Sequence, residues 1–141
     1  MKRTICLILI TFSLLCPAKA FTRRAFTVFI GDSPESSGWN KLASANDQSI
    51  ILKMLKDNAF LSENIICLQD REATHDAIVN ALDKLLSLTE TGDQIYVHFS
   101  CHGQQITDQD GDEALINPRD IYDEAIVPAD ACIAYGWNGY K

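Results

Sequence analysis

The feature that most constrains the fold is an apolar, β-branched and aromatic run, Tyr96–Ser100, which stops shortly afterwards at the pair His102-Gly103. This composition is typical of a buried strand. Two earlier runs of the same kind, Ala25–Ile30 and Asn64–Leu68, also end at polar or glycine-containing segments. With the third strand taken as Gln94–Ser100, the chain offers at least three buried strands, which suits a sheet covered on both faces.

Apolar residues at helical spacing separate these strands. Between the first and second strands, Leu42–Phe60 predicts an amphipathic helix that ends near Asp57. Between the second and third strands, a helix is expected to begin at Thr74, with apolar pairs at helical spacing as far as Leu86. A last short strand is expected at Glu124–Val127. This alternation predicts an α/β fold with a parallel, helix-covered sheet that the last strand continues.

Residues 1–20 have the pattern of a secretory signal peptide. A basic start is followed by an apolar core, Ile5–Cys16, and by the small-x-small pattern Ala18-Lys19-Ala20. The apolar core is too short to span a bilayer comfortably, so a retained membrane anchor is the weaker interpretation. We therefore expect residues 21–141 to form one domain of a secreted or periplasmic protein, with no membrane contact after cleavage.

Charge and cysteine content narrow the classes of partner. Loss of residues 1–20 would change the formal net charge from −7 to −10, because that segment holds three basic side chains and no acidic one. So acidic a product is a poor partner for nucleic acid or an anionic membrane surface. Three cysteines remain after residue 20, and their spacing matches neither a zinc site nor a disulfide framework: Cys67, Cys101 and Cys132. One disulfide between two of them remains an alternative in an oxidising compartment.

Of the three histidines, His102 is the strongest candidate for chemistry. It follows a buried strand, and open α/β sheets place their reactive groups at the carboxyl ends of strands. Imidazole titrates near neutral pH and can serve as acid or base, while Gly103 lets the backbone approach a ligand closely. We expect His75 to lie on a helix surface and His98 to be a hydrogen-bonded core residue.

Residues 108–113 form an acidic run with aspartates at alternate positions. The run resembles a calcium loop, but the EF-hand pattern fails, because Glu113 replaces the required glycine and Arg119 replaces the bidentate glutamate. A solvated acidic turn and a cation-binding loop both remain open. Residues 108–130 hold eight acidic side chains and one basic side chain, so this region suits a cationic ligand.

A different enzyme class is suggested by Gly31-Asp32-Ser33, which follows the first strand. It resembles the start of the Gly-Asp-Ser esterases, in which the serine is the nucleophile. Those enzymes need an Asp-x-x-His partner, and no such pattern occurs in this sequence. The esterase interpretation is therefore weak.

Four segments, taken together and in order, resemble the caspase-like cysteine peptidases, with the bacterial metacaspase-type branch as the nearest form. They are Ser37–Leu42 leading to Asn46-Asp47, the strand that ends in Ser-x-His-Gly, the Asp-Gly-Asp-Glu run, and Tyr122–Asp130 with its final Pro-x-Asp. The resemblance extends over Phe26–Asp130. It implies a three-layer α/β caspase-like sandwich with a mostly parallel sheet.

The resemblance also implies the roles of individual residues. His102 matches the catalytic histidine, and the backbone N–H of Gly103 matches a donor of the oxyanion hole, where it stabilises developing negative charge. Asp47 and Ser100 match positions that line the pocket for the residue before the scissile bond.

The ligands that the resemblance implies are a basic peptide and calcium. The loop that matches the pocket, residues 31–40, has acidic side chains and no basic one, which implies a peptide or protein substrate with Arg or Lys. Asp123 matches a calcium-site aspartate of some metacaspases. Cysteine peptidase chemistry itself requires no cofactor, so calcium would be an additional ligand.

The resemblance leaves the nucleophile unaccounted for. The family's cysteine lies in an Asp-x-Cys-His-x-Gly motif after a further strand, and no such motif occurs in this sequence. Cys101 is adjacent to His102, and strand alternation sends neighbouring side chains to opposite faces. We therefore expect an incomplete, truncated peptidase domain that is inactive by itself. The alternative is a non-catalytic binding module that captures basic peptides or calcium on its acidic surface.

Overall fold

The computed structural model describes residues 21–108, 110–112, 115 and 121–133. The expected signal peptide, as well as Glu113 and Arg119 of the acidic region, lies outside the described residues. Within the described part of the chain, no helix has the length and apolar character that crossing a membrane requires.

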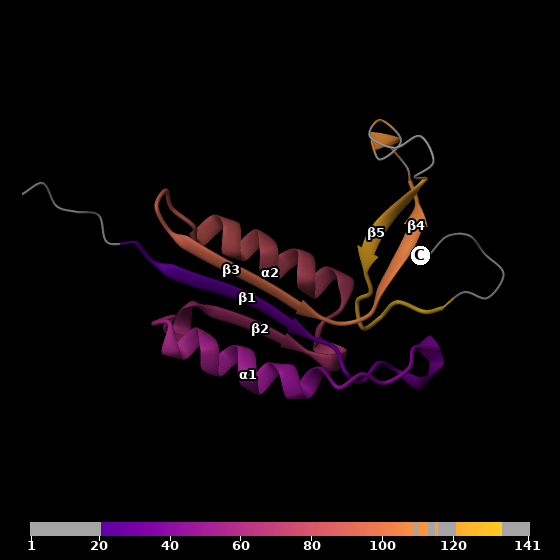
Figure 1. Ribbon diagram of the computed structural model, residues 1–141, viewed down its shortest axis with the longest axis horizontal. Helices are drawn as coiled ribbons and strands as arrows, with labels where there is room; N and C mark the ends of the chain where they lie inside the picture. Colours follow the sequence, from indigo (N-terminus) through magenta and orange to yellow (C-terminus); the bar gives the residue numbers. More distant parts are fainter. Residues whose placement is uncertain (1–20, 109, 113–114, 116–120, 134–141) are drawn as a thin grey trace, which may run out of the picture.

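Three parallel strands form the central sheet, in the order β2-β1-β3 (Figure 1). Their bounds are β1 (Arg23–Phe29), β2 (Ile65–Gln69) and β3 (Gln94–Ser100). Phe29 pairs with both Gln69 and Ser100, so the three strands end together. The prediction of three adjacent parallel strands is confirmed, with the bounds of the first two shifted by one or two residues.

β1 is the buried middle of this sheet. It pairs with β2 along one edge and with β3 along the other, and residues 25–30 are at most 2% exposed. The ring of Phe26 meets that of Phe99 on β3 edge to face, with centroids 5.7 Å apart. Because apolar side chains fill both faces, the strand appears in the sequence as a continuous apolar run.

Two helices, α1 (Ser44–Asp57) and α2 (His75–Leu88), cover opposite faces of the sheet (Figure 1). Alternate residues of β2 show the two faces. Ile66 and Leu68 pack against the core cluster that includes α2, whereas Cys67 Sγ lies 3.6 Å from Gln48 Nε2 on α1. The predicted three-layer α/β arrangement is confirmed.

Local chemistry sets where the two helices begin and what they bury. Thr74 Oγ1 accepts the backbone N–H of Ala77 at 3.2 Å, which satisfies a donor at the start of α2, as an N-cap should. The fully buried Leu55 attaches α1 to the sheet. Three short 3₁₀ turns complete the connections: Glu35–Ser37, Ser62–Asn64 and Asp70–Glu72.

The segment after β3 differs from the prediction. β4 (Gly103–Thr107) was not predicted, and it pairs antiparallel with β5 (Tyr122–Ile126) in a two-stranded hairpin separate from the sheet (Figure 1). The strand expected at Glu124–Val127 is present as β5, with its bounds shifted by one or two residues, but it lies outside the parallel sheet that the order of the elements predicted. Only two residues separate β3 from β4, too few for the crossover that a parallel neighbour of β3 would need, and β5 pairs with β4 instead of with the sheet.

One carboxylate joins the start of β1 to the turn before β3. Asp93 accepts the backbone N–H of Thr22 at 2.8 Å and that of Glu90 at 3.1 Å, and Arg24 Nε donates to it at 3.2 Å. These backbone hydrogen bonds favour the charged form, so they hold the pKa of Asp93 below its usual value of 3.8.

The first prediction tests the burial of α1. Leu55→Ala removes a fully buried side chain, so we expect the free energy of unfolding to fall by about 2–5 kcal/mol. Leu86→Ala is the matched control on α2, because Leu86 is 70% exposed, and we expect a change within about 0.5 kcal/mol. Urea denaturation followed by circular dichroism measures both values. Equal losses in the two variants would contradict the packing of α1.

The second prediction concerns the pH dependence of stability. Since the pKa of Asp93 is lower in the folded state, its contribution is present above the usual value of 3.8 and is lost as the pH falls below it. Asp93→Asn should therefore lower the melting temperature at pH 6 and reduce the further drop between pH 6 and pH 3. Thermal melts at both pH values check this. An unchanged pH dependence in Asp93→Asn would rule out this role of the carboxylate.

Candidate active site

The loop after β1 is fixed at the edge where the strands end. Asp70, the first residue after β2, accepts the backbone N–H groups of Gly31 and Asp32 with the same Oδ1 atom, at 2.9 Å each. A Cβ on Gly31 would lie 2.9 Å from the Leu42 carbonyl oxygen, so the close passage of the two backbones requires glycine. The loops that follow β1 and β2 therefore meet in a defined arrangement.

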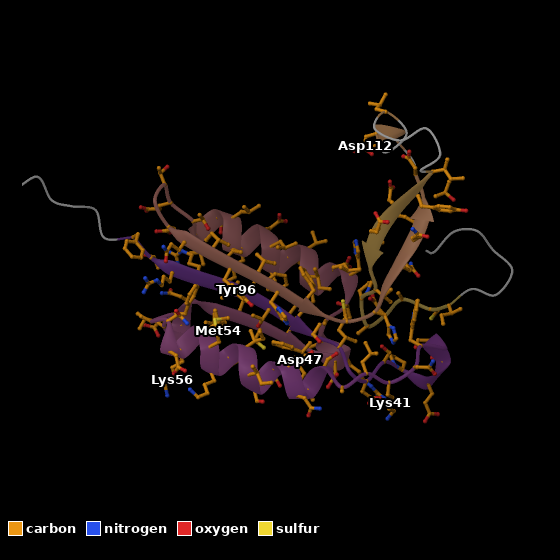
Figure 2. The ribbon with its side chains drawn as sticks, in the orientation of Figure 1. Lys41, Asp47, Met54, Lys56, Tyr96 and Asp112 are labelled. Atoms are coloured by element: carbon orange, nitrogen blue, oxygen red, sulfur yellow. The ribbon has the colours of Figure 1, made fainter. Side chains whose placement is uncertain are left out.

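Asp47 and Ser100, the two predicted pocket residues, are in direct contact. Ser100 Oγ, at the end of β3, donates to Asp47 Oδ2 at 2.6 Å. Figure 2 shows Asp47 near the start of α1, beside the end of the sheet toward which the strands point. The buried Ser44 holds this part of α1 in place, because its Oγ donates to the Ile30 carbonyl oxygen at 3.1 Å.

An open pocket of about 430 Å³ surrounds this pair. Asp47 is exposed, and among the described residues that line the pocket it is the only charged one. The lining residues are Leu42, Ala43, Ser44, Asn46, Asp47, Phe99, Ser100 and Cys101. A pocket with one carboxylate at an otherwise uncharged wall can bind a cationic side chain.

His102 is held by two neighbouring residues of the loop after β1. Its Nε2 lies 2.7 Å from the Asn40 carbonyl oxygen, and its ring packs at a tilt against that of Trp39, with centroids 4.9 Å apart and planes inclined by 32°. Because a carbonyl oxygen can only accept, Nε2 carries a hydrogen, and in the neutral imidazole the lone pair then lies on Nδ1. This is the tautomer in which Nδ1 can take up a proton.

The segment after β5 holds the loop that carries Trp39 and Asn40. Ile133 N–H donates to the carbonyl oxygen of the buried Ser37 at 2.7 Å. Gly38 has φ +80°, a conformation that favours glycine, and a Cβ there would lie 3.5 Å from the Ile133 side chain. A residue from far along the sequence thus holds the loop whose Trp39 and Asn40 contact the ring of His102.

The backbone of Gly103 has the orientation that an external acceptor needs. Val127 N–H donates to the His102 carbonyl oxygen at 2.9 Å, which makes Gly103 and Ile126 a pair without hydrogen bonds between them in the antiparallel ladder. The N–H of Gly103 therefore points away from β5. A Cβ at Gly103 would lie 3.7 Å from the Ala125 carbonyl oxygen, an ordinary contact, so packing within the described residues does not itself require glycine there.

A second group of acidic residues lies at the far end of the hairpin. Carboxylate oxygens of Asp108, Asp112 and Asp123 all lie within 4.8 Å of one another. Asp108 Oδ1 also accepts the N–H groups of Asp110 and Gly111, which folds the loop back on itself. Figure 2 shows Asp112 well away from Asp47, so the two acidic sites are separate.

Electrostatic crowding is evident in this group. A hydrogen bond with Asp112, together with repulsion from the carboxylates of Asp112 and Asp108, raises the pKa of Asp110. Oxygen donors of this kind suit a hard cation such as calcium. The sequence indicated Asp123 and, separately, the acidic run 108–113, but not which members of that run meet Asp123. The alternate aspartates were a sign of them, but only the hairpin register brings them to Asp123.

The predictions for the other two histidines differ in how well they agree with the structure. His75 is exposed on the first turn of α2, as predicted, with Nδ1 3.0 Å from Asp76. His98 lies between the rings of Phe29 and Tyr96, but its buried Nε2 has no hydrogen-bond partner among the described residues. The expectation of a hydrogen-bonded core histidine is therefore not met at Nε2.

The three cysteines of the described segment carry free thiols. The side chain of Cys101 packs against the core cluster beneath α2, whereas the ring of His102 turns toward Trp39. Burial raises the pKa of Cys101, which keeps it in the unreactive thiol form. Its position and protonation are those of a structural cysteine.

Comparison with known proteins identifies the family that the sequence motifs resemble. A family model described as "Metacaspase, peptidase C14 domain" matches residues 28–134. Metacaspase III c of Phaeodactylum tricornutum is 33% identical over 124 residues, which cover 84% of this chain and 35% of that protein. Metacaspase-1 of Candida albicans is 31% identical over 91 residues, covering 60% and 20%. Metacaspase-1 of Pyricularia oryzae is 41% identical over 59 residues, covering 42% and 14%.

The chain spans about a third or less of the length of these relatives. The expected bacterial branch stays a prediction, since the matches support the metacaspase family as a whole. The family match includes both the Asp47–Ser100 pair and the His102 loop. The chain therefore belongs to the metacaspase family of C14 peptidase domains.

Proposed function

We propose that this chain provides the histidine-bearing part of a cysteine endopeptidase that cleaves peptide bonds after Arg or Lys. The observation that carries the proposal is the hydrogen bond between Ser100 and Asp47 beside His102. Ser100 precedes His102 by two residues, and the ring of His102 is held in the tautomer in which Nδ1 can act as a base. The pocket and the base therefore lie at the same edge of the sheet. A single bound peptide can therefore reach both the pocket and His102.

His102 would act as general acid and base. Its Nε2–H stays on the Asn40 carbonyl, so Nδ1 accepts the proton of the attacking thiol and later returns a proton to the leaving amine. The oxygen of the attacked carbonyl gains negative charge in the same step. The N–H of Gly103 points out of the hairpin, where it would donate to that oxygen.

Asp47 would select the basic side chain. A guanidinium or ammonium group in the pocket would form a charge-assisted hydrogen bond with this exposed carboxylate. The acidic loop after β1 contributes less, since the carboxylate of Asp32 is paired with Lys41 at 3.0 Å. We therefore assign the preference for Arg or Lys chiefly to Asp47.

The chain by itself should not turn over substrate. Within the described residues, Cys101 is half-buried with a raised pKa, Cys67 lies on β2 against Gln48, and Cys132 is exposed beyond β5. No contact joins any of these thiols to the ring of His102 within that part of the chain. The nucleophile would have to come from a further segment or from another chain.

The third prediction separates binding from turnover. We expect the chain to bind a short arginyl peptide, with no cleavage of fluorogenic arginyl or aspartyl substrates. Asp47→Asn should weaken binding of the arginyl peptide about tenfold or more, the usual size for a hydrogen bond to a charged group. Asp83→Asn, an exposed change on α2, is the matched control and should leave binding unchanged. Fluorescence anisotropy measures each dissociation constant.

Two results would contradict this function. Turnover that disappears in His102→Ala would show that the chain carries a nucleophile of its own. Equal affinity for arginyl and aspartyl peptides would refute the role of Asp47 in selection.

We also propose that Asp108, Asp112 and Asp123 bind calcium. Support comes from the convergence of three carboxylates and from the repulsion among them, which a divalent cation would relieve. The alternative function, a module that binds basic peptides or calcium without catalysis, would use these same groups. The signal-peptide pattern of residues 1–20 supports export, and exported calcium modules are usually weak binders.

The fourth prediction is a calcium affinity of roughly 0.1–1 mM. Asp123→Asn should reduce the affinity at least tenfold, because it removes one of three charged ligands. Asp83→Asn again serves as the control with the same change of charge. Isothermal titration calorimetry measures the binding. If calcium gives no heat of binding with the unaltered chain, residues 108–113 are a solvated acidic turn and not a calcium site.

A further inference from the structure

We infer that Trp39 is a positioning residue that keeps the imidazole of His102 in one plane and one tautomer. The inference rests on the proposed role of His102 as a base and extends it to the neighbour that controls the ring. Trp39 needs no contact with substrate for this role. It acts through the ring that it covers.

The geometry assigns separate tasks to two adjacent residues. Trp39 contacts the face of the imidazole, with centroids 4.9 Å apart and planes inclined by 32°. Asn40 contacts its edge, through the carbonyl oxygen 2.7 Å from Nε2. One short loop therefore holds the ring from two directions.

The hydrogen bond alone would not fix the base. Rotation about the terminal torsion of a histidine is broad, and the half-buried ring of His102 leaves water to compete for the Asn40 carbonyl. The indole packed against its face restricts the plane of the ring. Within that plane, the carbonyl then selects the edge that carries Nε2, so the lone pair of Nδ1 keeps one direction.

The loop is built firmly enough to hold the indole in place. The carbonyl of Ser37, which is 2% exposed, accepts the N–H of Ile133, and Ser37 Oγ accepts the N–H of Trp39 at 3.3 Å. Gly38 lets the backbone turn between these two contacts with φ +80°. Trp39 is thus bonded across the turn to Ser37, which is itself held by Ile133.

The fifth prediction compares ring nitrogens by NMR. In the ¹⁵N-labelled chain, long-range ¹H–¹⁵N spectra should show His102 as a single Nε2–H tautomer above the pH at which its imidazole is protonated. Trp39→Leu should lose this signature, with the two ring nitrogens moving toward averaged shifts. Trp39→Phe should restore it, because a smaller aromatic face still defines the plane of the ring.

Two further variants control for changes in packing. Trp39→Met fills space without a flat face and should behave like Trp39→Leu, even if one of the two disturbs the fold. Phe60→Leu is the matched control, because it removes an aromatic contact with Tyr96 at 6.4 Å without touching His102. Its His102 signals should be unchanged, and the backbone amide signals of β3 report whether each variant remains folded.

A folded Trp39→Leu or Trp39→Met variant that keeps the single Nε2–H tautomer would overturn the inference. An Nδ1–H tautomer in the unaltered chain, or failure of Trp39→Phe to restore the signature, would do the same. The spectra read the ring without any substrate. A failure to bind the arginyl peptide would therefore count against the proposed function and leave the inference standing.

Discussion

The structure depends on the position of β1, which is paired on both edges and buried on both faces. A strand so placed satisfies its backbone groups only when β2 and β3 are both present. Because the three strands are parallel and in register at Phe29, their following loops emerge at one edge. Packing of the core thereby decides where the chemistry can lie.

The two candidate sites use this framework differently. The pocket proposed for a peptide and His102 lie at the edge of the sheet, where Asp70, Ser44 and Ser100 fix the loops through short polar contacts. The acidic cluster lies at the far end of the hairpin. The near end of the hairpin follows β3 after two residues. The first site is therefore supported by the core, and the second by local turns.

The sequence predicted the elements whose pattern is local. β1 and β3 were recognised because they are apolar runs, and α2 because Thr74 caps an amphipathic stretch. β4, and with it the pairing of β5 in a hairpin, was missed because the residues of both strands alternate between half-buried and exposed, without an apolar face. The contact of Asn40 with His102 joins residues 62 positions apart, and only the folded chain reveals it. The resemblance supplied Asp47 and Ser100, which no local pattern marks.

The central claim is that the basic-residue pocket and the base of His102 form one site, and affinity labelling tests it most directly. A lysyl chloromethyl ketone would place its cationic side chain at Asp47 and alkylate Nδ1 of His102, with chloride as the leaving group. Mass mapping should show faster labelling of His102 by this reagent than by a phenylalanyl analogue, with the preference abolished in Asp47→Asn. Equal rates for the two reagents, or labelling of His75 as fast as His102, would contradict the account.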